Sequence, residues 1–237
     1  MTRAERTDRH GFRFRGGENT RIEAFTDAAF AFAVTLLVIG AGHPPTNIDE
    51  LMRALSGLPG YAASFALLCV FWYAHYMWYK RYGVEDGRSV MLSLLLVFLV
   101  LIYVYPLHMM FDAAISLGDS PATVRSPRDW KKTYEIFGIA YTSMSAVVML
   151  FYLYALRLRH KLALEPFEIA VTRSSVWRWC IQTGVGILSA ALAMLLVTDT
   201  RGVREVVPGL VYWLIPVSNL ALRGHLRRRL AAIGAAS

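Results

Sequence analysis

Five long stretches of the chain contain no Asp, Glu, Lys or Arg. Each runs for 17 to 22 residues, and a helix needs about 20 apolar residues to cross the hydrocarbon core of a bilayer. The stretches cover residues 58–79, 90–111, 136–156, 179–198 and 206–222. Their lengths predict membrane-spanning helices, with the last one at the short limit.

A sixth apolar stretch, residues 22–41, differs because Glu23 and Asp27 interrupt its first third. We interpret it as a spanning helix as well. The prediction is an all-α integral membrane protein with six transmembrane helices. The helices occupy a six-helix transmembrane domain at residues 21–223, between a basic tail at 1–20 and a second basic tail at 224–237.

Composition agrees with a membrane protein and excludes several other classes. Hydrophobic residues make up 56% of the 237 residues, charged residues only 18%, and the formal net charge is +8. So much apolar sequence excludes a disordered chain, and two cysteines cannot form a disulfide scaffold. A nucleic-acid partner is not expected, because too little polar surface is available for one.

The distribution of basic residues predicts the orientation. Of the 25 lysines and arginines, 18 lie in the N-terminal tail, the second and fourth connections and the C-terminal tail. Connections rich in Lys and Arg stay on the cytoplasmic side. Both termini are therefore expected in the cytoplasm, where the basic tails would contact anionic membrane lipids.

No pattern in the sequence points to catalysis. Phosphate-binding, nucleophile-elbow and zinc-protease motifs are absent from the sequence. His75 and His108 are expected near opposite ends of their helices, so they cannot share a metal ion. We predict no enzyme activity, no catalytic residues, no metal site and no cofactor.

The first helix carries the most informative pattern. At 100° per residue, Phe32, Leu36 and Ile39 share one face, and Thr35 lies at its edge. Asp27 lies about 140° away from Phe32 and is expected to point towards neighbouring helices. Charged residues within spans are uncommon and suggest a functional site. The alternative interpretation is an ordinary core-facing stripe with a capping Asp near the helix start.

His75 on the second helix is expected at a depth similar to that of Thr26 and Asp27. A hydrogen bond between His75 and Asp27 would satisfy both polar groups away from water. The sequence therefore predicts a contact between the first two spanning helices at this level.

These residues together resemble a known family. Arg21, Phe25, Thr26 and Asp27, followed by an alanine-rich stretch and Thr35-Leu36-Leu37, are similar to the signature of the transmembrane protein 175 family. Trp72 and His75 on the second helix and the run 94–106 also match the family pattern. The resemblance covers residues 21–106. Members of this family are potassium-permeable channels of bacterial membranes and of endosomes and lysosomes.

The resemblance implies a homotetramer in the bacterial inner membrane, with four first helices lining a pore for K⁺ and other monovalent cations. By position, Phe32, Leu36 and Ile39 would form the constriction and Thr35 would lie at the selectivity level. It further implies a packed structural network that holds the first helix in place, formed by Arg21, Phe25, Thr26, Asp27, Trp72 and His75.

Two positions depart from the family pattern. Thr26 replaces the usual Ser and keeps the hydroxyl, and Phe32 stands where Ile or Leu normally forms the narrowest ring. An apolar ring gates by dewetting and cannot replace ion hydration with carbonyl oxygens. We therefore expect weak to moderate potassium selectivity. The competing interpretation is a membrane protein that is no channel, such as a small carrier or an assembly factor.

Overall fold

The computed structural model describes residues 7–8, 11–17, 19–40, 45–115, 126–196 and 206–234. These residues are mainly helical, and the only β pairing among them is one isolated bridge between Thr7 and Arg13. The all-α class is confirmed for the described part of the chain. Both predicted tails fall partly outside it, at 1–6, 9–10, 18 and 235–237.

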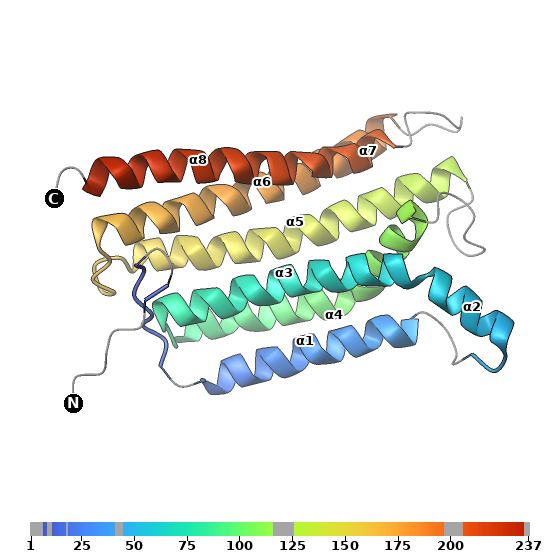
Figure 1. Cartoon of the computed structure of the whole chain (residues 1–237), viewed down its shortest axis with the longest axis horizontal. Helices are drawn as coiled ribbons and strands as arrows, with labels where there is room; N and C mark the ends of the chain where they lie inside the picture. Colours follow the sequence, from blue (N-terminus) through green and yellow to red (C-terminus); the bar gives the residue numbers. More distant parts are fainter. Residues whose placement is uncertain are drawn as a thin grey trace.

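The long described helices run alternately in opposite directions, as in an up-and-down bundle (Figure 1). In order they are α1 (Arg21–Gly40), α2 (Ile48–Ser56), α3 (Leu58–Tyr82), α4 (Gly87–Ile115), α5 (Pro127–Arg157), α6 (Pro166–Leu196), α7 (Val207–Leu210), the 3-10 turn η2 (Val211–Trp213) and α8 (Leu214–Gly234).

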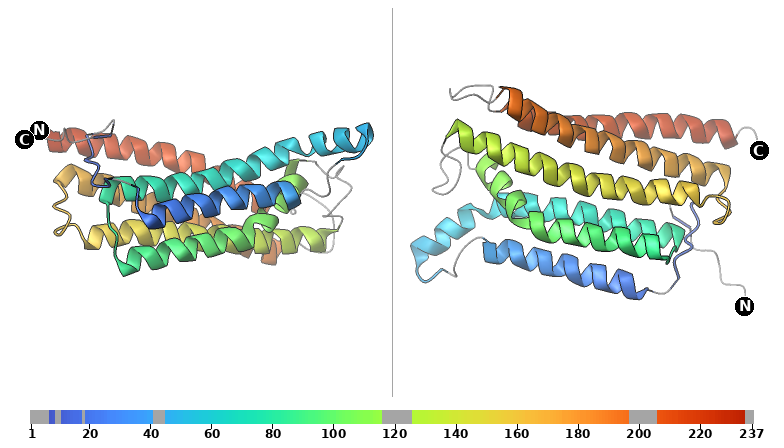
Figure 2. Two further views of the ribbon diagram at one scale, coloured as in Figure 1. Left: turned by 90° about the horizontal axis from the view of Figure 1, so that it is seen from below. Right: turned by 180° about the vertical axis from the view of Figure 1, so that it is seen from behind.

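The long helices lie side by side, with α1 at one flank of the bundle and α8 at the other (Figures 1 and 2). The start of α1 and the ends of α3 and α8 lie at the same end, which we call the basic end because α3 finishes there with Lys80 and Arg81. The short helix α2 projects from the opposite end.

Length and hydropathy qualify four of the described helices to cross a membrane: α1, α4, α5 and α6. The pair α2 and α3, bent by 46°, gives a fifth candidate when it is counted as one span. The last predicted span, residues 206–222, is divided between α7, η2 and the first half of α8. Helix α8 then continues to Gly234, so the predicted tail boundary at residue 223 lies inside a helix. Six spans stay a prediction.

Local signals in the sequence explain where two of these helices begin and end. Ser126 caps α5, accepting from the Asp129 N–H while the Asp129 side chain accepts from the Ser126 N–H, which satisfies two otherwise unpaired donors. Helix α3 ends at Gly83, whose φ of 57° is left-handed. A side chain there would also meet the Arg15 carbonyl oxygen at 2.7 Å, so only glycine lets the N-terminal segment pass so closely.

The closest helix pair is α5 with α6, and small residues allow it. A Cβ atom added to Gly138 would lie 2.9 Å from the Gly186 carbonyl oxygen, and one added to Gly186 would lie 2.4 Å from the Thr142 hydroxyl oxygen. Small residues let helix backbones approach within a membrane, where van der Waals contact replaces the hydrophobic effect between helices. Helices α3 and α4 pack on the α5 side of this hairpin, and α7 and α8 pack on its α6 side.

Candidate functional site

Helix α1 presents one face away from the rest of the chain. Phe32 is 56% exposed and Ile39 is 60% exposed, although both are large hydrophobic side chains. Thr35 is also exposed, whereas Leu36 is half-buried. The face predicted from helical periodicity is therefore the one that the single chain leaves uncovered.

The opposite side of α1 is packed inward. Thr26, Phe30, Ala33 and Leu37 are each at most 4% exposed, and they recur at the i, i+4, i+7 spacing of one helix face. Helix α1 makes its contacts through this side with α3 and α4. The helix is thus anchored along one side and free along the other.

Thr35 lies at the edge of the exposed face. Its hydroxyl donates to the Ala31 carbonyl at 3.2 Å, one turn back along the helix. This bond uses the hydroxyl proton and leaves the oxygen lone pairs available. The Thr35 oxygen is therefore free to accept a hydrogen bond or to act as a ligand.

Asp27 joins α1 to α3. The Trp72 indole N–H donates to the Asp27 carboxylate at 2.8 Å, beside a small cavity of about 300 Å³ whose lining includes Phe30, Val34 and Leu68. A hydrogen bond to a charged acceptor is stronger than one between neutral groups. The bond links α1 to α3, and its donor is Trp72.

The hydrogen bond expected between His75 and Asp27 is not formed. The His75 Nε2 atom lies 3.0 Å from the Ser93 hydroxyl of α4, and the Tyr79 hydroxyl lies 3.2 Å from the same oxygen. Trp72 and His75 are three residues apart, so their side chains leave α3 about 60° apart, which is enough for them to meet different helices. Trp72 therefore reaches α1, whereas His75 is buried against α4.

The other residues implied for the structural network divide into two groups. Thr26 is fully buried and its hydroxyl donates to the Ile22 carbonyl at 2.8 Å. Arg21 and Phe25 are exposed in the single chain. The fold thus brings Asp27 and Trp72 together, places His75 one turn away, and leaves Arg21 and Phe25 on the outer side of α1.

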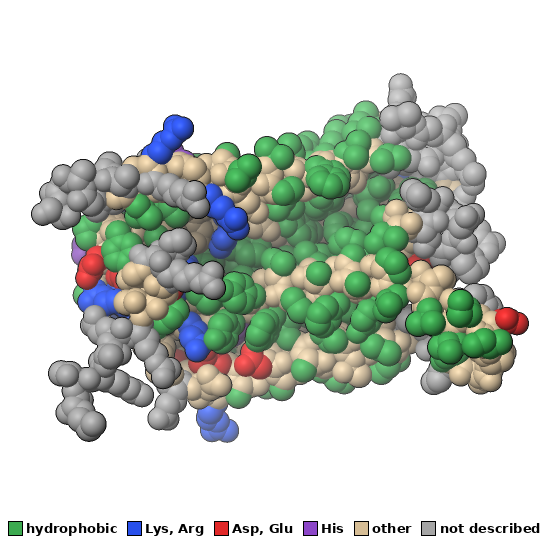
Figure 3. Space-filling model, in the orientation of Figure 1, with side chains coloured by type: hydrophobic (Ala, Val, Ile, Leu, Met, Phe, Trp, Pro, Cys, Tyr) green, Lys and Arg blue, Asp and Glu red, His purple; other side chains and the backbone are tan. Residues whose placement is uncertain are grey.

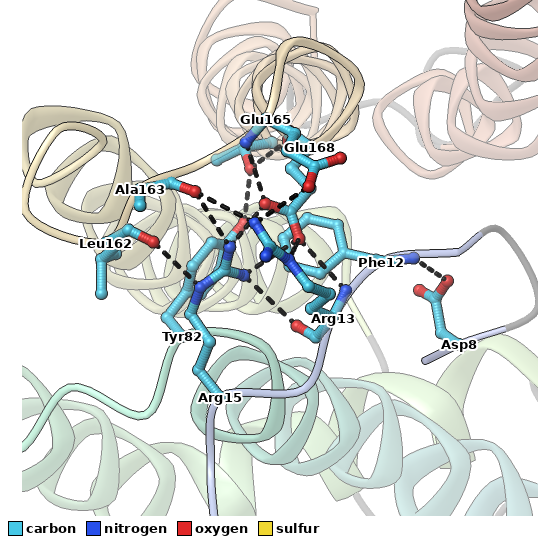
Figure 4. A network of polar contacts seen from close by, with 10 residues as sticks. Asp8, Phe12, Arg13, Arg15, Tyr82, Leu162, Ala163, Glu165 and Glu168 are labelled. Carbon is cyan, nitrogen blue, oxygen red and sulfur yellow. Dashed lines mark hydrogen bonds and ion pairs between the residues drawn. The ribbon is translucent and has the colours of Figure 1, made fainter. Parts of the chain in front are cut away.

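A polar network that sequence reasoning missed lies at the basic end (Figure 4). Glu168, in the first turn of α6, is fully buried. Its carboxylate accepts from the Arg15 guanidinium at 2.5 and 3.0 Å, from the Arg13 N–H at 3.1 Å and from the Glu165 N–H at 3.0 Å. These bonds fasten the N-terminal segment, residues 11–17, to the start of α6.

The same segment is held by packing and by backbone contacts. Phe12 is fully buried and meets Tyr82 edge to face at 5.6 Å between ring centres. The Gly16 N–H donates to the Lys80 carbonyl at 3.1 Å. From the sequence these arginines are interpreted as topology determinants and lipid contacts. The available signal for this network is Glu168, which lies among the apolar residues Phe167, Ile169 and Val171.

Comparison with known proteins identifies the family. A sequence profile described as "Endosomal/lysosomal potassium channel TMEM175" matches residues 21–106, the range that holds the exposed face of α1 and the Asp27–Trp72 bond. A potassium channel from Marivirga tractuosa is 31% identical over 194 residues, which are 78% of this chain and 78% of that protein. The chain belongs to the TMEM175 family.

Further relatives agree. A potassium channel from Chamaesiphon minutus is 33% identical over 105 residues, covering 41% of this chain and 52% of that protein. The fold superposes on a crystallised variant of the potassium channel MtTMEM175 with a TM-score of 0.76, at 27% identity over 94% of this chain and 100% of that one. A TMEM175 homologue from Chamaesiphon minutus, at 21% identity and a TM-score of 0.54 over 87% and 96%, shares the fold.

Membership in the TMEM175 family, together with several long apolar helices, makes this a membrane protein. Within the described residues no three His, Cys, Asp or Glu side chains come together as a metal site would need. The candidate functional site is therefore the exposed face of α1, supported by the Asp27–Trp72 bond behind it.

Proposed function

We propose that the protein is a homotetrameric potassium channel whose pore is lined by four copies of α1. Phe32, Leu36 and Ile39 form its constriction. The observation that carries this proposal is the exposed face of α1, where Phe32 and Ile39 remain more than half exposed in a single chain. Its relative from Marivirga tractuosa is itself named a potassium channel.

The anchored side of α1 supports the same assignment. A pore-lining helix must present a constant surface to the ion, so it has to be fixed against its own subunit. The buried row from Thr26 to Leu37 and the Asp27–Trp72 bond fix α1 in this way. Arg21 and Phe25 lie on the outer side, where they are available for contacts between subunits.

Selectivity in such a pore depends on how much hydration each ion must lose. An apolar ring offers no replacement oxygens, so a narrow ring dewets and a wider one passes a partly hydrated ion. A ring of four Thr35 hydroxyls supplies some oxygens beside the constriction. We infer weak to moderate preference for K⁺ over Na⁺.

The arrangement of the ends supports a cytoplasmic basic end in the bacterial inner membrane. The start of α1 and the end of α8 lie at that end (Figure 1), and it carries Lys80 and Arg81. Clusters of Lys and Arg remain on the cytoplasmic side of a membrane. Anionic lipids there would contact the same residues.

Cation flux into proteoliposomes tests the proposal. Phe32→Ala should raise K⁺ flux, because removing four phenyl rings widens the constriction. Phe98→Ala is the matched control, since Phe98 is 59% exposed on α4 and lies off the proposed pore. An unchanged flux in Phe32→Ala, or an equal rise in Phe98→Ala, would place the pore elsewhere.

Two further measurements separate the channel from a carrier or an assembly factor. Thr35→Ala should lower the K⁺/Na⁺ permeability ratio measured from reversal potentials, because it removes the hydroxyl oxygens. The intact protein should have the mass of four chains in a mild detergent. A monomer would refute a pore built from one helix per subunit.

A further inference from the structure

A long groove opens between α3 and α8, and the function proposed above does not use it. Its volume is about 1120 Å³, and its walls come from α3, α4, α5, α6 and the segment from α7 to the start of α8. Figure 3 shows this hollow between α8 and α3, lined with hydrophobic side chains. We propose that the groove binds one anionic phospholipid, with an acyl chain along its walls and the phosphate at Arg178.

The walls fit a hydrocarbon chain. Val70, Tyr73 and Met77 of α3 line one side, and Leu210, Trp213 and Ile215 line the other. Along α3 the groove extends from Ala66 to Arg81, about 22 Å at 1.5 Å per residue. One leaflet of hydrocarbon is about 15 Å deep, so an acyl chain from the leaflet at the basic end lies wholly inside the groove.

The end of the groove towards the basic end is positively charged. Arg81 lies in the last turn of α3, Arg178 of α6 also lines the groove, and no Asp or Glu occurs among the described lining residues. Arg81 is partly neutralised, because its guanidinium donates to the Asp8 carboxylate at 2.9 Å. Arg178 forms no ion pair with any described residue. This end therefore has an unbalanced positive charge.

Two buried N–H donors of the groove lining lack an acceptor within the described part of the chain. The Arg178 Nε atom and the Trp179 indole Nε1 atom are buried, and neither has a hydrogen-bond acceptor among the described residues. A buried donor without an acceptor costs about 1–3 kcal/mol. Both residues line the groove, and the phosphate and ester oxygens of a phospholipid are the acceptors that these N–H groups lack.

A phospholipid fits better than a second copy of the chain. In the tetramer proposed above, α1 surrounds the pore axis, whereas α8 lies at the opposite flank of the bundle (Figure 1). The groove then faces the bilayer instead of the axis. This step rests on the proposed function, and the experiment below reads lipid binding and oligomeric state separately.

Native mass spectrometry of the purified full chain tests the proposal. The protein is incubated with equal amounts of dioleoylphosphatidylglycerol and dioleoylphosphatidylcholine, and the bound lipids are counted for each oligomer. Arg178→Gln should lower the preference for phosphatidylglycerol about fivefold, the factor expected for one arginine at an anionic headgroup. Arg173→Gln is the matched control, because Arg173 is exposed on the same helix and does not line the groove.

A second variant tests the acyl-chain part. Val70→Trp fills the middle of the groove and should reduce binding of both lipids, while Arg178→Gln changes only the preference. An unchanged preference in Arg178→Gln, or unchanged lipid counts in Val70→Trp, would overturn the proposal. Loss of the oligomer with unchanged lipid counts would identify the groove as a contact between copies and would also refute it.

Discussion

Replacing Glu168 by Gln should release the N-terminal segment from the start of α6. The carboxylate accepts four hydrogen bonds, two from the Arg15 guanidinium and two from backbone N–H groups. The Gln amide keeps one acceptor oxygen, but its NH₂ group would face N–H donors that now bond to the second carboxylate oxygen. It also leaves the Arg15 guanidinium without its counter-charge.

The size of the effect follows from burial. Removing one partner of a buried ion pair costs about 3–5 kcal/mol. The Arg15 side chain is 17% exposed and regains some hydration, so we expect the lower limit of about 3 kcal/mol. That corresponds to an increase of about 100-fold in the population of the released segment.

Limited proteolysis measures this population. Trypsin cleaves after Arg13 and Arg15 only when the segment is released, and the cleavage rate follows the open population when closing is fast. Mass spectrometry separates these two cuts from cuts elsewhere in the chain. The rate for Glu168→Gln should rise about 100-fold over that of the unmodified protein.

Glu165→Gln is the matched control for this experiment. Glu165 pairs with Arg13 at 3.1 Å, but its side chain is 52% exposed, and exposed ion pairs contribute about 0–1 kcal/mol. The cleavage rate should therefore rise no more than about fivefold. An unchanged rate in Glu168→Gln, or an equal rise in both variants, would refute the reasoning.

Two other perturbations address separate contacts. Trp72→Phe removes the N–H donor to Asp27 and should lower the stability of the protein by about 1.5–3 kcal/mol. The loss is measured as a lower Tm in detergent. An unchanged Tm would show that the bond contributes nothing. Burial raises the pKa of Asp86, but hydrogen bonds from Tyr154 and Ser89 outweigh it and hold the pKa below its ordinary value. The stabilisation from the ionised Asp86 is complete above about pH 4 and is lost as the pH falls through the lowered pKa. Asp86→Asn should therefore reduce the fall of Tm at acid pH. A plot of Tm against pH parallel to that of the unmodified protein would contradict this.

Features that depend on one helix could be predicted from the sequence. A period of 3.6 residues places Phe32, Leu36 and Ile39 on one face of α1, although periodicity alone does not say whether that face is exposed or buried. In the structure Phe32 and Ile39 are more than half exposed. Helix starts with local caps, such as Ser126 with Asp129, are similarly encoded within a few residues. These signals need no knowledge of how the helices pack.

Features that depend on how two helices are aligned could not be predicted. Asp27 and His75 were expected at similar depth, but the rotation of α3 about its axis decides which of Trp72 and His75 faces α1. The Glu168–Arg15 pair joins residues 153 positions apart, and no local pattern links them. Residues 206–222 are apolar, which predicts one continuous helix. The structure instead has α7, η2 and the start of α8 there, with Pro208 in α7 and Pro216 in the first turn of α8.

The attachment of the N-terminal segment also limits how α1 can move. Gly16 is bonded to Lys80 at the end of α3, and α1 begins at Arg21. The five residue steps from Gly16 to Arg21 span at most about 17 Å. The first turn of α1 is therefore tethered to the end of α3. While this tether holds, any opening of the proposed pore would pivot α1 about its basic end. The largest displacement would then occur beyond Ile39, at the far end of the proposed constriction.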